Sequence, residues 1–185
     1  MGLSPPAPPE GAVAAFTIRR VVEPWSGLAV QACAVVRESI TRCCAADHGD
    51  DPAVLGAWLA NKTPAQFTAW LSAPGAMAWA AYRGEGVDAD AGAGAGVHAP
   101  MVGFALVLPP ATLALCYVVP EVLGQGVGRA LLQAAEVGAR QCGAPALVLD
   151  STRTAQGFYR RNAYAPAGAA KAWAGLWAQP LSKRL

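Results

Sequence analysis

Residues 114–132 read Ala114-Leu-Cys-Tyr-Val-Val-Pro120-Glu-Val-Leu-Gly124-Gln-Gly126-Val-Gly128-Arg-Ala-Leu-Leu132. The stretch starts as an apolar, strand-like run, turns through three glycines at alternate positions, and continues with the apolar spacing of a helix. Glycine lacks a Cβ atom, so this turn can bring its backbone close to a ligand with its N–H groups outward. The helix that follows directs the positive end of its dipole at the same place. The stretch therefore predicts a phosphate-binding turn. The plainer alternative is a tight turn that binds no ligand.

The rest of the chain shows alternating strand and helix patterns. We predict strands over residues 14–22, 76–83, 102–108, 112–119 and 146–150, and a closing hairpin within 164–185. Helices are predicted from Pro24, after Asp51, after Thr63, from Arg129 to Gly143, and around Phe158 and Tyr159. The order strand, helices, three strands, helix, strand, helix, strands predicts an α/β fold with a mixed sheet.

Two short helices have N-terminal signals in the sequence. Asp51 and Thr63 are predicted N-caps, each followed by a proline at the first helical position. Gln66 completes a capping box with Thr63. The two helices are expected to carry Trp58 and Trp70 toward the core.

The chain length of 185 residues fits one domain with tails. Residues 1–12 are rich in proline and are expected to form a disordered tail. Residues 13–185 are then expected to form a single domain. Within it, residues 84–99 are rich in glycine and alanine and are expected to form a flexible loop.

The charge pattern argues against nucleic-acid and membrane partners. The formal net charge is +2, and 14 % of the residues are charged, against about 25 % in an average domain. Basic residues are scattered rather than clustered, which excludes an electrostatic nucleic-acid binder. The apolar residues 101–120 are long enough to span a bilayer, but Pro109 and Pro110 would break a helix at the centre. Two buried strands joined by a turn are expected there instead.

The five cysteines do not have the spacing of metal ligands. Cys33, Cys116 and Cys142 fall at apolar positions and are expected to be small core residues. Cys43 and Cys44 are adjacent, so they could form a redox-active pair or simply end a helix. We expect no metal site, and the odd cysteine count suits a reducing cytoplasm.

Two common phosphate-binding patterns do not fit the glycine turn. A dinucleotide fingerprint needs a third glycine where this chain has Arg129. That fingerprint also follows the first strand of its domain, whereas the glycine turn here follows the fourth predicted strand. A Walker A loop needs Lys and Ser or Thr after the last glycine, whereas Gly128 is followed by Arg129 and Ala130.

The glycine turn and a second segment together resemble the GNAT superfamily of acyl-CoA-dependent N-acyltransferases. Residues 117–132 are similar to the family's pyrophosphate-binding motif. Residues 147–164 are similar to its strand and helix with a Phe-Tyr pair, here Phe158 and Tyr159, followed by the aromatic Tyr164. The resemblance covers roughly residues 14–184. It implies a mostly antiparallel central sheet flanked by helices and splayed between the fourth and fifth strands.

The resemblance also implies acetyl-CoA as co-substrate and a set of residues that bind it. Tyr159 would donate a proton to the departing thiolate. A tyrosine with a pKa near ~10 can do this for a thiol near ~8.5, and the alternative is a core aromatic. The residues implied to bind the co-substrate are Tyr117, Val118, Val119, Gly124, Gln125, Gly126, Val127, Gly128, Arg129, Ala130, Thr154 and Phe158. An unpaired backbone N–H between Tyr117 and Val119 would hold the thioester carbonyl.

The chain departs from the family pattern at three places. Leu123 stands where the family often has Gln or Arg, and Thr154 stands where it often has Asn. The fourth strand carries no acidic residue to deprotonate an acceptor amine. The possible substitutes are Glu38, Asp47, His48 and Asp50, and no base is assigned. Arg129, Arg153 and Arg160 could bind the phosphates of CoA or simply lie on helix surfaces.

Together these features predict a cytoplasmic N-acetyltransferase that moves an acetyl group from acetyl-CoA to a primary amine of a small molecule or peptide. The alternative is a non-catalytic module that senses acyl-CoA. The acceptor pocket would be built by the first two helices and the last hairpin, where Trp58, Trp70, Trp173 and Trp177 could line it or fill the core. The protein is expected to be a monomer or a homodimer.

Overall fold

The computed structural model describes residues 16–22, 26–84, 99–173 and 175–185. Its strands are β1 (Phe16–Val21), β2 (Met77–Arg83), β3 (Met101–Leu108), β4 (Thr112–Val118), β5 (Ala146–Ser151), β6 (Ala165–Pro166), β7 (Lys171–Trp173) and β8 (Leu176–Arg184). Its helices are α1 (Ser26–Cys43), α2 (Ala45–His48), α3 (Pro52–Leu59), α4 (Pro64–Leu71), α5 (Val127–Gln141) and α6 (Arg153–Arg161), with a 3-10 turn η1 (Pro120–Val122).

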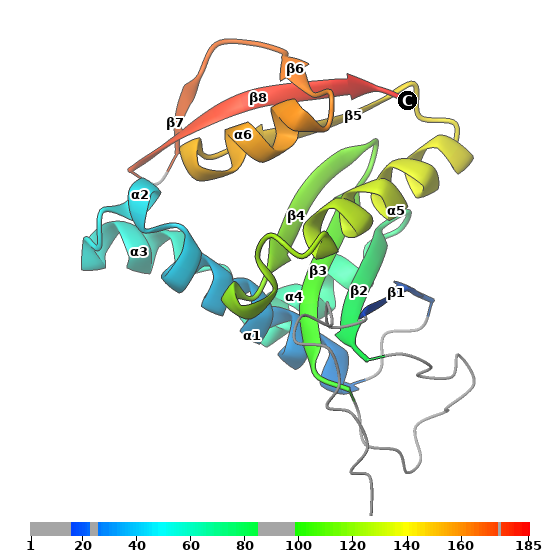
Figure 1. Cartoon of the computed structure of the whole chain (residues 1–185), viewed down its shortest axis with the longest axis horizontal. Helices are drawn as coiled ribbons and strands as arrows, with labels where there is room; N and C mark the ends of the chain where they lie inside the picture. Colours follow the sequence, from blue (N-terminus) through cyan, green and yellow to red (C-terminus); the bar gives the residue numbers. More distant parts are fainter. Residues whose placement is uncertain (1–15, 23–25, 85–98, 174) are drawn as a thin grey trace, which may run out of the picture.

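The strands form a sheet in the order β1-β2-β3-β4-β5-β8-β6, and β7 pairs with β8 (Figure 1). Neighbouring strands are antiparallel except for β4 and β5, which are parallel. The connection between this parallel pair runs through η1 and α5, as a crossover between parallel strands requires. The predicted mixed, mostly antiparallel sheet is confirmed.

Strands β4 and β5 meet at one end only. Thr112 lies beside Val148, and the Val148 N–H donates to the Ala111 carbonyl oxygen at 3.1 Å. Within the described residues the two strands share no further pair, although β4 continues to Val118 and β5 to Ser151. The splay expected between the fourth and fifth strands is therefore confirmed, and the facing edges of both strands are left open beyond Thr112.

Strand β4 contains one extra residue relative to β3. Leu106 lies opposite Leu115, whereas the next residue, Val107, lies opposite Leu113. Ala114 is the residue left over, so it forms a β-bulge. The bulge lies just after the point where β4 and β5 separate, and it changes the direction in which the rest of β4 presents its edge.

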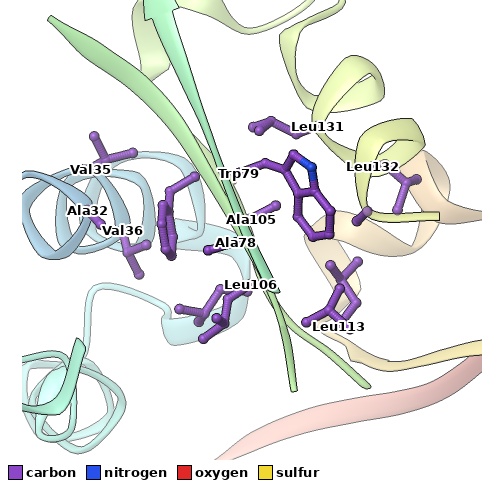
Figure 2. Packing of buried hydrophobic residues seen from close by; sticks show 14 of the residues in the cluster. Ala32, Val35, Val36, Ala78, Trp79, Ala105, Leu106, Leu113, Leu131 and Leu132 are labelled. Carbon is purple, nitrogen blue, oxygen red and sulfur yellow. The ribbon is translucent and has the colours of Figure 1, made fainter. Parts of the chain in front are cut away.

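Different helices cover the two faces of the sheet. Val35 and Val36 of α1 pack on one side of the strands, and Leu131 and Leu132 of α5 pack on the other (Figure 2). Trp79 of β2 lies on the α5 side in the same view. Each face thus has its own layer of helix, and the sheet separates them.

Local signals in the sequence placed several helix ends correctly. The Asp51 carboxylate accepts hydrogen bonds from the N–H groups of Ala53 and Val54, and the Thr63 hydroxyl oxygen accepts one from Gln66. Trp58 is buried, and Trp70 is half-buried against the core.

Some predicted details were wrong. Helix α5 begins at Val127, two residues before Arg129, and the left-handed Gly126 is its N-cap. Cys142 is exposed rather than part of the core, since it is the C-cap residue at which helix α5 ends. Cys116 is only half-buried, whereas Cys33 is a core residue as expected. The predictions for residues 1–12 and for 85–98, and the Trp173 side chain, lie outside the described residues.

Candidate functional site

The gap between β4 and β5 opens into a cavity of about 740 Å³, a size typical of small-molecule sites. Ser39, Cys43 and Cys44 line it from the end of α1, on one face of the sheet. The glycine turn and α6 line it from the face that carries α5. The cavity therefore reaches both faces of the sheet, so a ligand entering from one face can meet a second ligand from the other.

The glycine turn has two distinct kinds of glycine. Gly124 and Gly126 have φ of 76° and 87°, so both positions require the left-handed conformation that glycine adopts without strain. Gly128 has no such requirement, because it lies in the first turn of α5. A Cβ added at Gly128 would lie 3.7 Å from the Phe158 ring, in ordinary contact. Neither backbone strain nor crowding explains Gly128, although glycine costs about 1 kcal/mol relative to alanine in a helix.

The N-terminus of α5 presents free N–H groups beside this glycine. Gly126 is the N-cap and has no side chain to cap the helix, and the first intrahelical bond runs from the Ala130 N–H to the Gly126 carbonyl oxygen at 3.0 Å. The N–H groups of Val127, Gly128 and Arg129 therefore have no partner within the helix. An anion placed here meets three donors and the positive end of the helix dipole.

Side-chain contacts hold the turn in place. The Gln125 side chain donates from Nε2 to the Glu121 carbonyl oxygen at 2.8 Å, across the turn. Arg42 of α1 donates to carboxylate oxygens of Glu38 at 2.6 Å and Glu121 at 2.8 Å. The turn is thus tied to the end of α1. Leu123 is exposed and lines the cavity, where the family often has a polar side chain.

The open edge of β4 supplies further N–H donors. The Val119 N–H donates to the Val102 carbonyl oxygen at 2.9 Å, so Val119 faces β3. In an antiparallel pair the direction alternates along the strand, and the register is regular from Leu115 to Val118. Cys116 and Val118 therefore direct their N–H groups to the other edge, toward the gap. Within the expected stretch from Tyr117 to Val119, Val118 is therefore the residue whose N–H faces the gap, and Cys116 lies outside that stretch.

Tyr159 lines the cavity from α6 and is itself 7 % exposed. Its ring packs edge-on against Phe158 and Tyr164, with centroid distances of 5.1 and 5.6 Å. Burial raises the pKa of the Tyr159 hydroxyl well above its usual value near 10, with a smaller contribution from Cys116. The hydroxyl therefore keeps its proton at neutral and mildly alkaline pH.

Tyr117 and two thiols form the wall on the α1 side. Burial raises the pKa of Tyr117, the charge of Cys44 adds to this, and a hydrogen bond with Trp58 acts in the opposite direction. Burial also raises the pKa of the Cys44 and Cys116 thiols to about 12. Both thiols are therefore protonated near neutral pH and are poor nucleophiles.

The four candidate bases lie in different environments. Glu38 is paired with Arg42 beside the glycine turn. The Asp50 side chain is 83 % exposed. His48 is buried rather than at the surface, and its Nδ1 accepts a hydrogen bond from the Asp50 N–H at 3.1 Å. None of these three lines the cavity.

The fourth candidate, Asp47, has a structural contact. Its carboxylate accepts a hydrogen bond from the Thr154 N–H, at 3.3 Å to Oδ1. This bond connects α2 to the first turn of α6, so Asp47 caps that helix from a distance. No catalytic role follows from this position.

The structure brings together most residues of the predicted site. The predicted residues that line the cavity are Tyr117, Val118, Gly124, Gly126, Gly128, Arg129, Thr154, Phe158 and Tyr159. The other four do not line it: Val119, Gln125, Val127 and Ala130. The sequence analysis missed the wall residues Ala114, Cys116, Asp150 and Thr152. Thr152 is the N-cap of α6, yet its side chain makes no capping bond. Asp150 and Thr152 belong to the run Asp150-Ser151-Thr152 before α6, whose residue types indicate possible helix caps rather than a binding site.

Comparisons with known proteins place the chain in a class of acyl-transfer enzymes. A family model described as Acetyltransferase (GNAT) domain matches residues 81–185, more than half of the chain. The chain belongs to this family of acetyltransferases. The free N–H groups at the N-terminus of α5 suit the anionic pyrophosphate of an acyl-CoA. No curated protein sequence matches the chain.

Solved structures show the same fold over nearly the whole chain. A GCN5-related N-acetyltransferase from Rhodopseudomonas palustris is 26 % identical with a TM-score of 0.71, over 93 % of this chain and 96 % of that one. The PaiA N-acetyltransferase from Thermoplasma acidophilum, solved in complex with coenzyme A, is 17 % identical with a TM-score of 0.67, over 92 % and 99 %. The ribosomal-protein-S18-alanine N-acetyltransferase from Escherichia coli is 15 % identical with a TM-score of 0.60, over 92 % and 94 %.

Among the described residues, no group of His, Cys, Asp or Glu side chains is arranged to hold a metal ion. None of the helices in the described part of the chain combines the length and apolar character needed to cross a membrane.

Proposed function

We propose that this protein is an N-acetyltransferase that moves an acetyl group from acetyl-CoA to a primary amine of a small molecule or peptide by direct attack. The observation that carries the proposal is the cavity, which reaches both faces of the sheet through the gap between β4 and β5. One entrance has an anion-binding helix end, and the other is free for an acceptor. Cysteine usage suits a reducing cytoplasm, and that location is part of the proposal.

The first turn of α5 would bind the pyrophosphate. The N–H groups of Val127, Gly128 and Arg129 are the donors, and Gly128 leaves room for close approach. Gly124 and Gly126 shape the turn through their left-handed backbone. Arg129 is exposed at the same entrance and adds positive charge.

The open edge of β4 would polarise the carbonyl. Acetyl-CoA supplies an activated thioester, whose carbonyl oxygen gains negative charge as a neutral amine attacks, after the ammonium form has lost a proton to solvent. The carbon–sulfur bond then breaks and the thiolate leaves. The Cys116 N–H points into the gap, where a fixed donor stabilises developing charge better than mobile water does. The Val118 N–H lies two residues further along the same edge and would hold the arm of the ligand.

Tyr159 would donate a proton to the departing thiolate. Its hydroxyl is protonated because burial raises its pKa. The same raised pKa makes it a weaker acid, so proton donation should contribute modestly. Phe158 and Tyr164 hold the ring in place.

Calorimetry with acetyl-CoA tests the binding part of the proposal. The parent protein should bind acetyl-CoA, and a Gly128→Glu change should abolish binding, because it places a carboxylate where the pyrophosphate would lie. This position has no left-handed φ, so the variant avoids the backbone strain of a change at Gly126. Gly56→Glu is the matched control, since Gly56 is exposed on α3 with open space around it. Equal binding by Gly128→Glu and the parent would contradict the proposed site.

A non-catalytic acyl-CoA sensor is the second candidate. It is favoured by the absence of any acidic residue on β4 within the cavity wall and by the exposed Leu123 in the glycine turn. A sensor and an enzyme both bind acetyl-CoA. Only the enzyme releases thiol in proportion to added amine.

A further inference from the structure

Asp150 lies across the gap from the bulge of β4. Strands β4 and β5 run parallel, and Thr112 lies beside Val148. Two residues further along each strand come Ala114 and Asp150, and both line the cavity. The carboxylate is therefore at the level of the gap where the strand edges begin to separate.

The Asp150 side chain points to the α1 side of the sheet. Leu113 faces α5 (Figure 2), so Thr112 and its neighbour Val148 face the opposite side. Alternate residues of a strand share a face, and Asp150 is two residues after Val148. Burial agrees, because Leu147, Leu149 and Ser151 are buried whereas Val148 and Asp150 are exposed. Asp150 therefore lies on the face opposite the helix that would bind the co-substrate.

The Asp150 carboxylate already forms an ion pair with an ammonium group. Lys171 of β7 places its Nζ 2.8 Å from Asp150 Oδ2. The two side chains are 56 % and 48 % exposed, and such ion pairs are weak, at about 0 to 1 kcal/mol. Lys171 does not line the cavity, but Asp150 does. A primary ammonium is thus held at the edge of the cavity by a bond that a competing ammonium can replace.

We propose that Asp150 is the acceptor-binding residue, that the acceptor is a cationic primary amine, and that the Lys171 ammonium marks the position its amino group takes. This rests on the proposed function and names the substrate class of the same site. A carboxylate forms charge-assisted hydrogen bonds with an ammonium and so selects charged amines over neutral isosteres of the same size. The sequence analysis sought such an acid on the fourth strand, whereas the structure supplies one from the neighbouring strand.

The competing interpretation is that the ion pair only fastens the β7–β8 hairpin to β5. The two interpretations predict opposite results for the two partners. If the pair is structural, removing either partner has the same effect. If Asp150 binds the acceptor, removing it weakens amine binding, but removing Lys171 strengthens amine binding, because an internal competitor is gone.

Butylammonium is the probe, because it is a simple primary amine that is charged at neutral pH, and butanol is its uncharged isostere. Chemical-shift titration of the full ¹⁵N-labelled chain measures both affinities without turnover. We expect Asp150→Asn to weaken butylammonium binding about threefold to fivefold, and Lys171→Met to strengthen it about threefold. Asp150→Glu should restore part of the loss, and butanol binding should not change. A urea unfolding curve for each variant checks that it folds.

Two results would overturn the inference: no butylammonium binding by the parent, or a change of the same sign in both variants. Acetyl-CoA calorimetry on the same samples distinguishes a failure of the Asp150 assignment from a failure of the proposed function. If the parent fails to bind acetyl-CoA, the proposed function fails, while the butylammonium titration still decides the role of Asp150. If acetyl-CoA binds equally to parent and variants but butylammonium does not respond as expected, only the acceptor assignment fails.

Discussion

At the scale of the residue, Tyr159 is the proposed proton donor. Its ring is fixed by Phe158 and Tyr164, and the residue lines the cavity. We expect Tyr159→Phe to lower kcat about tenfold to a hundredfold with little change in KM, since the lost interaction forms only as the thiolate departs. Steady-state kinetics measure this. Tyr82→Phe is the control, because Tyr82 lies on β2 and does not line the cavity. A Tyr159→Phe variant as fast as the parent would remove Tyr159 from the mechanism.

The raised pKa of Tyr159 also predicts the alkaline side of the pH profile. A tyrosine donates a proton only while it is protonated, and burial keeps Tyr159 protonated to a higher pH than the usual value near 10. We therefore expect kcat to show no loss attributable to this residue below pH 10. A profile of kcat from pH 7 to 10.5 checks this. A decline centred near pH 8 to 9 in the parent that disappears in Tyr159→Phe would contradict the assignment.

At the scale of the element, helix α5 packs very closely on the sheet at Gly138. A Cβ at Gly138 would lie 2.7 Å from the Trp79 ring atom Cη2, closer than such atoms approach. We expect Gly138→Ala to destabilise the protein by about 1 to 3 kcal/mol through overpacking. Gly56→Ala, in an exposed helix with open space, should instead stabilise it by about 0.5 to 1 kcal/mol. Urea unfolding of both variants tests the pair, and a Gly138→Ala variant as stable as the parent would contradict the packing.

Local signals predicted the elements better than their contacts. The glycine turn, the N-caps at Asp51 and Thr63, and the Phe158-Tyr159 helix follow from short-range rules, and the structure has each element where it was expected. Gly138 was not singled out, because its partner Trp79 is distant in sequence.

The same limit applies to the site. The proposed phosphate-binding side of the site comes from one continuous stretch, so its composition was visible in the sequence. Cys116 and Asp150 depend on the pairing of β4 with its neighbours, and a one-residue bulge at Ala114 determines which N–H groups face the gap. No local pattern encodes that register.

At the scale of the whole molecule, buried thiols link stability to pH. Burial raises the pKa of Cys44 to about 12, so the folded state keeps a proton that the unfolded chain releases. Stability from this group is complete below the unfolded pKa near about 8.5 and declines as pH rises toward 12. We expect a loss of about 1 to 2 kcal/mol between pH 7.5 and 10 from Cys44 alone. Urea unfolding at both pH values, repeated on Cys44→Ala, measures it. An equal loss in that variant would contradict the cause.

The central claim is that the chain transfers an acetyl group to an amine through the gap between β4 and β5. The most direct measurement mixes the purified protein with a cationic primary amine and acetyl-CoA that carries a ¹³C-labelled acetyl group. Free thiol and labelled amide are recorded together, for a panel of such amines. The account predicts amine-dependent thiol release with one labelled amide per thiol, abolished by Gly128→Glu. Acetyl-CoA binding without amine-dependent release for any amine would contradict it and would leave an acyl-CoA sensor.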